Sequence, residues 1–161
     1  MTIPRRIRDY LDSQNVPYET LHHSQAFGGQ ERAHTLHVSG KRCVKAVVVK
    51  GDERALLAVI PASHRLNLQE LSIALKVSQL DVLPEGELEG LFPDCELGAV
   101  PPLGKLYGIE VWVDRAVADT EQIVFCAGTH EDCIRMRYAD FARLVQPRVG
   151  RIGELAISKA A

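Results

Sequence analysis

The sequence predicts a fold of the α+β class (mixed α/β), with helices around a mixed β-sheet core. Apolar runs typical of strands interleave irregularly with apolar residues at helical spacing. Two of the strongest strand-like runs are separated only by a polar turn, which indicates a hairpin. A doubly wound sheet requires regular alternation of strands and helices, so a layered mixed sheet is favoured.

The first part of the chain predicts a helix, a short strand and a second helix. Pro4 suits a first helical turn, and apolar residues then recur at helical spacing, so we expect a helix over residues 4–14. Tyr18 to Leu21 has the character of a short strand. Helical spacing returns over residues 30–38, where we expect a second helix.

The hairpin is the strongest local prediction. Val44 to Val49 and Ala55 to Ile60 are apolar runs of strand length, and the polar residues 51–54 between them are typical of a turn. A helical pattern follows Asn67, with Glu70 in the position of a capping box. We therefore expect a two-stranded unit followed by a capped helix.

The second half predicts shorter elements. We expect a weak strand within residues 77–82, a helix from Pro84 to about Gly90, a loop rich in glycine and proline over residues 93–104, strands at 108–114 and 122–126, and a helix at 138–145. The segment from about residue 148 is polar and small, so we expect a frayed tail.

The bulk properties predict one domain over residues 1–161. The length and the 46% hydrophobic content are ordinary for one globular domain. The net charge of −2 excludes a general basic surface for nucleic acid, so any phosphate contact would be local. The sequence has neither a signal-peptide pattern nor an apolar stretch of about 20 residues, which predicts a cytoplasmic protein without a membrane span.

Lys45 stands out because it lies within a valine-rich strand. Strand alternation places its side chain on the same face as Val47 and Val49. An ammonium among buried valines is costly unless it is paired or faces a cleft. Either Lys45 faces a binding crevice, or it lies at the start of the strand and extends its ammonium to water.

Two further segments contain glycines that can bring the backbone close to a ligand. In Gly98-Ala-Val-Pro-Pro-Leu-Gly104, the prolines fix the shape of the loop. Either its backbone N–H groups face a carbonyl or a water, or the loop is only a rigid turn between two elements. The segment Ala127-Gly-Thr-His130 follows a strand and is expected to lead into a helix, where its amides could bind an anion. In that case His130 could act as an acid, a base or a hydrogen-bond donor. The alternative is that Thr129 caps the helix and His130 is an exposed residue without a role in the site.

Other reactive residue types form no recognisable site. His34 and His37 have helical i, i+3 spacing, but no carboxylate or thiolate completes a metal site, and no cofactor is expected. The four cysteines lack a C-x-x-C pair, and we expect reduced thiols. Cys43, which lies near Lys41, Arg42 and Lys45 in the sequence, is the best-placed candidate for a nucleophile, and Cys126 is a second candidate; for Cys43 the role of a small core residue is favoured.

Three segments form an ordered set: Val44 to Val49 with Lys45, the loop from Gly98 to Gly104, and Ala127 to His130 followed by Ile134-Arg-Met136 and Asp140-Phe141. This set resembles the YbaK/EbsC family, also called the ProX or INS-like family, of trans-editing aminoacyl-tRNA deacylases. The resemblance extends from the first helix to Pro147. It implies the editing-domain fold and hydrolysis of the ester that joins an amino acid to the terminal ribose of tRNA.

The resemblance also implies roles for individual residues. Lys45 corresponds to a lysine that holds the 3′-terminal nucleotide, and the Gly98 and Pro102 positions match a G-x-x-x-P loop whose backbone positions the aminoacyl carbonyl and the attacking water. Gly128 and His130 match a turn that lines the aminoacyl pocket. The site residues expected on this basis are, as catalytic, Lys45, Gly98 and Gly128, and, as substrate-binding, Ala46, Val100, Pro101, Pro102, Thr129 and His130.

The same resemblance sets expectations for partners and chemistry. The 3′ end of aminoacyl-tRNA is the expected partner, an aminoacyl-tRNA synthetase is a candidate partner, and neither DNA nor a membrane is expected. Neither metal nor cofactor is required, because an acyl ester is already activated and the protein mainly orients water and stabilises an oxyanion. Lys41, Arg42, Lys45, Lys50, Arg135 and Arg137 are candidates for a basic rim that contacts phosphates.

Substrate choice and catalysis remain open at the level of sequence. Ala46 stands where several family members carry a polar residue that helps select the amino acid, so this position leaves the identity of the substrate open. The candidates are the small amino acids alanine, serine, threonine and cysteine. A non-catalytic module that binds tRNA or a small ligand is the alternative function. A hydrolase that uses Cys43 or Cys126 is a third hypothesis, which predicts inactivation by thiol alkylation.

Overall fold

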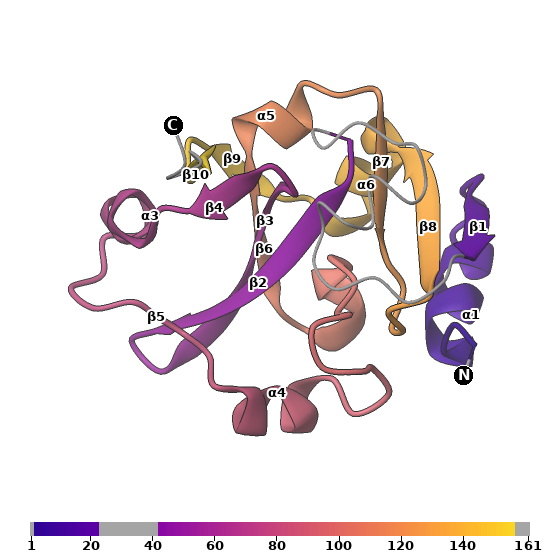
Figure 1. Ribbon diagram of the computed structural model, residues 1–161, viewed down its shortest axis with the longest axis horizontal. Helices are drawn as coiled ribbons and strands as arrows, with labels where there is room; N and C mark the ends of the chain where they lie inside the picture. Colours follow the sequence, from indigo (N-terminus) through magenta and orange to yellow (C-terminus); the bar gives the residue numbers. More distant parts are fainter. Residues whose placement is uncertain (1, 23–41, 157–161) are drawn as a thin grey trace.

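The computed structural model describes residues 2–22 and 42–156 and shows the predicted mixed α+β fold in this part of the chain. A five-stranded sheet crosses the middle of the molecule, and a smaller three-stranded sheet lies beside it (Figure 1). The helix expected at residues 30–38, and with it His34 and His37, lies outside the described residues.

The large sheet is built on the predicted hairpin. Its strands, in spatial order, are β5 (Asp81–Val82), β2 (Val44–Gly51), β3 (Arg54–Pro61), β6 (Glu110–Asp114) and β9 (Arg148–Gly150). Strands β2 and β3 are antiparallel, whereas β6 and β9 add in parallel. The hairpin turn places Asp52 at φ 51° and Glu53 at φ 65°. Two left-handed residues give the turn a twist that matches the strands.

The small sheet is antiparallel throughout. It consists of β1 (Glu19–His22), β8 (Asp132–Arg137) and β7 (Gln122–Cys126), with β8 in the centre. It joins the large sheet where Cys43 pairs with Val124 in parallel. A separate pair, β4 (His64–Leu66) and β10 (Gly153–Leu155), lies at the far side of the molecule. The starts of β2 and β7 therefore lie side by side.

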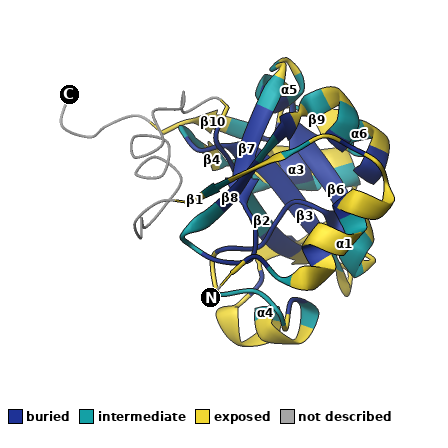
Figure 2. Cartoon of the chain, turned by 90° about the vertical axis from the view of Figure 1, so that its right-hand side faces the viewer, coloured by how far each residue is buried: buried dark blue, intermediate teal, exposed yellow. Residues whose placement is uncertain are grey.

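Helices cover the outer faces of these sheets. They are α1 (Arg5–Ser13), α3 (Leu68–Leu75), α4 (Glu85–Leu91), α5 (Arg115–Ala118), α6 (Tyr138–Val145) and the 3₁₀ helix η1 (Gly104–Tyr107). Asn67 caps α3 as predicted, because its side chain accepts a hydrogen bond from the Glu70 amide at 3.0 Å. Helix α4 buries none of its residues and is largely exposed (Figure 2).

The core divides into two clusters on opposite faces of the hairpin. The larger cluster joins the two sheets with α1 and α6, and includes Ile7, Leu11, Val44, Val48, Phe125, Ile134 and Phe141. The smaller cluster lies beneath α3 and includes Val49, Ile60, Leu71 and Trp112. Strand β2 thus alternates between the clusters, as its period of two requires.

Two sequence predictions are wrong. The segment from residue 148 is not frayed, because β9 pairs with β6 and β10 pairs with β4 as far as Leu155. The segment after Thr129 does not enter a helix, because Asp132 begins the central strand β8. Within the described residues, no helix has the length and apolar character needed to cross a membrane.

Candidate functional site

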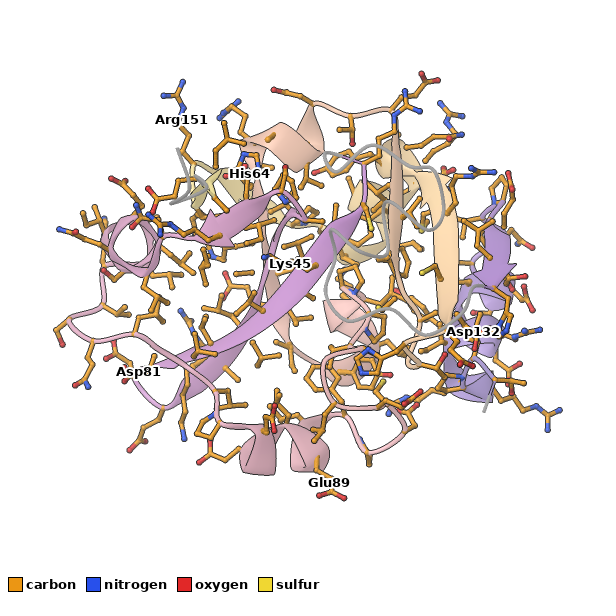
Figure 3. All side chains as sticks on the ribbon, viewed as in Figure 1. Lys45, His64, Asp81, Glu89, Asp132 and Arg151 are labelled. Atoms are coloured by element: carbon orange, nitrogen blue, oxygen red, sulfur yellow. The ribbon has the colours of Figure 1, made fainter. Side chains whose placement is uncertain are left out.

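Lys45 is the second residue of β2 and lies opposite Ile60 of β3. Figure 3 shows Lys45 on β2, near the middle of the view. The side chain is half-buried, and this burial lowers the pKa of its ammonium. Among the described residues, no hydrogen bond or ion pair compensates its charge. Such a cation is costly to the fold and available to a negatively charged ligand.

The Ala127–His130 segment is a turn between two strands of the small sheet. Gly128 has φ 90°, in the left-handed region that glycine adopts without strain. Thr129 is buried, and its hydroxyl donates to the Asp132 carboxylate at 2.6 Å while accepting from the Asp132 amide at 3.0 Å. Thr129 therefore closes the turn onto β8 and does not cap a helix.

Asp132 ties this turn to the edge of the small sheet. Its carboxylate also accepts a hydrogen bond from Nδ1 of His22 on β1, at 2.9 Å. Burial acts to raise the pKa of Asp132, but the hydrogen bonds from Thr129 and His22 outweigh it and lower the pKa. Asp132 is therefore held as a carboxylate that stabilises the start of β8.

Four hydrogen bonds fasten the glycine loop to this turn. The Gly128 amide donates to the Ala99 carbonyl at 2.9 Å, and the Glu96 amide donates to the Gly128 carbonyl at 2.8 Å. Nε2 of His130 donates to the Leu97 carbonyl at 2.6 Å, and the His130 amide donates to the Glu96 carboxylate at 3.3 Å. Residues 96–99 and 128–130 therefore form one unit, here called the two-turn clasp.

The clasp leaves backbone donors open. The amides of Leu97, Gly98 and Val100 have no acceptor within the described part of the chain, whereas Ala99 donates to the Glu96 carbonyl at 3.1 Å. Gly98 has φ 80° and is exposed, while Val100 is nearly buried. A cluster of amides without a protein acceptor can donate to a carbonyl oxygen that acquires negative charge.

The prolines of the loop stabilise this arrangement. Pro101 and Pro102 are both buried, and their rings fix the backbone at the point where the loop turns back into the core. Val100 belongs to the larger core cluster, against which Ala46 also packs. Ala46 and the loop thus both contact the larger core cluster.

The structure joins the two glycine-containing turns but gives Lys45 no direct contact with either. The link runs through the strands, because β2 and β7 leave the Cys43–Val124 pair in the same direction. The Val124 amide reinforces this pair by donating to the Arg42 carbonyl at 2.8 Å. Lys45 and the turn after Cys126 are therefore anchored at one junction of the two sheets.

Two of the residues expected in the basic rim, Lys50 and Arg135, do not join Lys45 as free cations. Lys50 is five residues beyond Lys45 on β2, which is about 16 Å along an extended strand. Arg135 is paired with Glu19 at 2.6 Å, so its charge is already balanced. Lys41 lies outside the described residues. Proximity in sequence therefore did not bring Lys50 beside Lys45.

Sequence reasoning missed two contributors to the site. Glu96 was not considered, because its partners Gly128 and His130 are more than thirty residues away. Asp132 was also missed, although the three-residue spacing from Thr129 is typical of a turn closed by side chains. The partner His22 was beyond the reach of any local signal.

The cysteines and metal ligands offer no competing centre in the described residues. Cys43 is fully buried and Cys126 nearly so, which withholds both sulfur atoms from a substrate in solution. Within residues 2–22 and 42–156, no group of three or more histidine, cysteine or carboxylate side chains is arranged to hold a metal ion.

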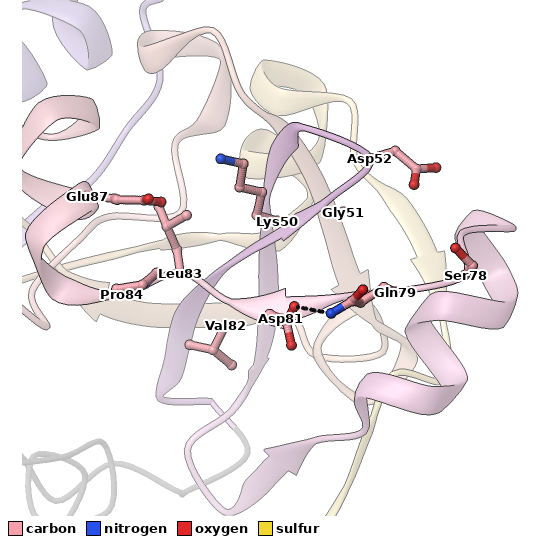
Figure 4. A pocket seen from close by; sticks show the side chains of 10 residues that line it. All are labelled: Lys50, Gly51, Asp52, Ser78, Gln79, Asp81, Val82, Leu83, Pro84 and Glu87. Atoms are coloured by element: carbon pink, nitrogen blue, oxygen red, sulfur yellow. Dashed lines mark hydrogen bonds between the residues drawn. The ribbon is translucent and has the colours of Figure 1, made fainter.

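Two open cavities lie away from the clasp, at the other end of β2. Each has a volume of about 510 Å³, and Lys50, Leu83 and Glu87 line both. Figure 4 shows the first, which Asp81, Val82 and Pro84 also line. Their walls mix acidic and basic side chains, and none of the expected site residues lines either of them.

Comparisons with known proteins agree with the fold. The family model for the aminoacyl-tRNA editing domain matches residues 23–144. A proline–tRNA ligase from Bacillus cereus (strain AH187) is 27% identical over 97 residues, which is 60% of this chain and 17% of the ligase. The chain thus spans about a sixth of that relative's length. A Bacillus mycoides proline–tRNA ligase is 26% identical over the same extent.

Solved structures show the same fold at low sequence identity. The crystal structure of a proposed trans-editing enzyme for prolyl tRNA synthetase superposes with a TM-score of 0.81 at 20% identity, covering 93% of this chain and 96% of that one. A hypothetical protein superposes with a TM-score of 0.84 at 18% identity, covering 93% and 100%. Because the family model covers well over half of the chain, including Lys45 and both turns of the clasp, the protein belongs to the aminoacyl-tRNA editing domain family.

Proposed function

We propose that the protein is a deacylase that acts in trans on mischarged tRNA. Water attacks the carbonyl carbon of the aminoacyl ester, the bond to the ribose oxygen breaks, and that oxygen takes up a proton. The products are the free amino acid and tRNA with an intact 3′ end. A proline–tRNA ligase and a proposed trans-editing enzyme among the similar proteins make a prolyl-tRNA synthetase the candidate partner.

The observation that supports this function is the set of open amides on the clasp, which lies within the range matched by the family model. Ester hydrolysis builds negative charge on the carbonyl oxygen, and preorganised amides stabilise that charge. Lys45 supplies a cation without a compensating partner among the described residues, and we assign it to the 3′-terminal nucleotide. This division of roles needs no protein nucleophile.

Ala46 is the candidate position for substrate choice. Its methyl group packs against the core cluster that also holds Val100, and it offers no polar group to a substrate side chain. An apolar residue at this position suits a small, apolar amino acid. We therefore place alanine first among the candidates, followed by serine, threonine and cysteine.

The test is release of labelled amino acid from a panel of tRNAs mischarged with these four residues. We expect release from at least one substrate, and in Lys45→Ala we expect KM to rise at least about 10-fold, the cost of one charge-assisted contact. Lys50→Ala is the matched control, because Lys50 lies on the same strand but far from the junction. It should change neither parameter.

Each result separates the hypotheses. The absence of release from every substrate by the folded wild-type protein would reject the deacylase and favour the non-catalytic binding module. Loss of activity on thiol alkylation without blockage of substrate binding would favour the cysteine-dependent mechanism. The burial of Cys43 and Cys126 argues against that last outcome.

A further inference from the structure

We infer that the Gly128–His130 turn is the element that aims two backbone donors of the glycine loop, and that His130 is a positioning residue. This inference rests on the proposed function and specifies how the oxyanion site is held. The donors are the amides of Gly98 and Val100. Each of them belongs to a peptide group whose carbonyl is held by the opposite turn.

Peptide geometry connects the two facts for Gly98. The carbonyl of Leu97 and the amide of Gly98 belong to one planar trans peptide, in which the C=O and N–H bonds point in opposite directions. Nε2 of His130 holds that carbonyl at 2.6 Å. The hydrogen bond therefore turns the Gly98 amide away from His130. It also polarises the peptide and strengthens the amide as a donor.

The same geometry applies two residues later. The carbonyl of Ala99 accepts from the Gly128 amide at 2.9 Å and shares its peptide group with the amide of Val100. The Val100 amide is therefore also turned away from the Gly128–His130 turn. Two donors on alternate residues with a common orientation can bind one oxygen atom.

The surroundings of His130 fit a fixed support. A Cβ at Gly98 would lie 3.2 Å from Cε1 of His130, so the imidazole edge packs directly against the loop backbone. The His130 amide adds a second attachment, to the Glu96 carboxylate at 3.3 Å. Nδ1 of His130 is buried and has no partner among the described residues. The ring thus contacts the loop through Nε2, which donates whether the imidazole is neutral or charged.

Two substitutions separate positioning from acid–base chemistry. His130→Gln retains an N–H donor of similar reach, whereas His130→Phe retains a ring but no donor. In single-turnover deacylation we expect His130→Phe to lose about 100-fold in rate, the low end for loss of an oxyanion donor, with KM within about 2-fold. His130→Gln should stay within about 5-fold of wild type, with an unchanged pH profile.

His64→Phe is the control, because His64 lies on β4 at the far side of the molecule from Asp132 and the turn (Figure 3). It should leave the deacylation rate unchanged. A His130→Gln variant that is folded but as slow as His130→Phe would overturn the inference and assign His130 to acid–base chemistry. A His130→Phe variant with near wild-type activity would overturn it as well.

A readout without substrate keeps this inference distinct from the proposed function. In ¹H–¹⁵N spectra of the free protein, the Gly98 amide should shift in His130→Phe but remain near its wild-type position in His130→Gln and His64→Phe. Unchanged Gly98 shifts in His130→Phe would refute the orienting role even if the protein is a deacylase. Absence of deacylation with the expected shifts would refute the proposed function and leave the orienting role intact.

Discussion

Gly128→Ala tests the packing of the site against α1. Gly128 has φ 90°, and a Cβ there would lie 2.6 Å from Cδ and 2.7 Å from Cγ of Pro4, at the start of α1. An L-residue with left-handed backbone costs about 1–2 kcal/mol. Overpacking against the proline ring adds about 1–3 kcal/mol. We therefore expect the free energy of unfolding to fall by about 2–5 kcal/mol, summing these two contributions.

Gly108→Ala isolates the backbone contribution. Gly108 has φ 70°, close to that of Gly128, but a Cβ there has no atom within 4 Å. Its expected cost is therefore about 1–2 kcal/mol alone. Combining Gly128→Ala with Pro4→Ala removes the colliding ring atoms and should bring the cost of the glycine substitution down toward the Gly108 value.

Urea denaturation followed by circular dichroism measures these differences from the transition midpoints and slopes. A domain with about 5–15 kcal/mol of stability remains measurable after such losses. The reasoning is refuted if Gly128→Ala costs no more than Gly108→Ala. It is also refuted if the cost of Gly128→Ala is the same with and without the Pro4 ring.

Two further predictions follow from titratable groups. The pKa of Asp132 is lower in the folded protein than its unfolded value of about 3.9, so its carboxylate stabilises the fold above that pH and loses this contribution as the pH falls through the folded pKa. Asp132→Asn should therefore lower the free energy of unfolding by about 1–3 kcal/mol at pH 6–7 and by progressively less below about pH 4. A cost in urea denaturation that is independent of pH would contradict this. Burial raises the pKa of the Cys95 thiol to about 11, so iodoacetamide should modify it slowly at pH 8 and rapidly once urea unfolds the chain. Mass spectrometry that finds native Cys95 labelled at the rate of an unfolded thiol would disprove the burial argument.

The elements that were predicted correctly have local causes. The β2–β3 hairpin follows from two apolar runs and a polar turn, and the Asn67 cap follows from its three-residue spacing to Glu70. Strand β8 and the strands after residue 148 were missed because their stability comes from pairing. Strand β8 contains Asp132, Arg135 and Arg137, and becomes a central strand only between β1 and β7.

The sequence by itself indicated the two turns, because Pro101 and Pro102 fix the backbone of the loop and Gly98 and Gly128 can adopt left-handed conformations without strain. It also determined that Lys45 is an unusual cation within a valine strand. Only the tertiary structure decided that the two turns form one clasp, that Arg135 is paired with Glu19, and that His130 holds the Leu97 carbonyl. The physical reason is that hydrogen bonds between residues thirty or more positions apart depend on how the two sheets pack against each other, and no local sequence pattern encodes that packing.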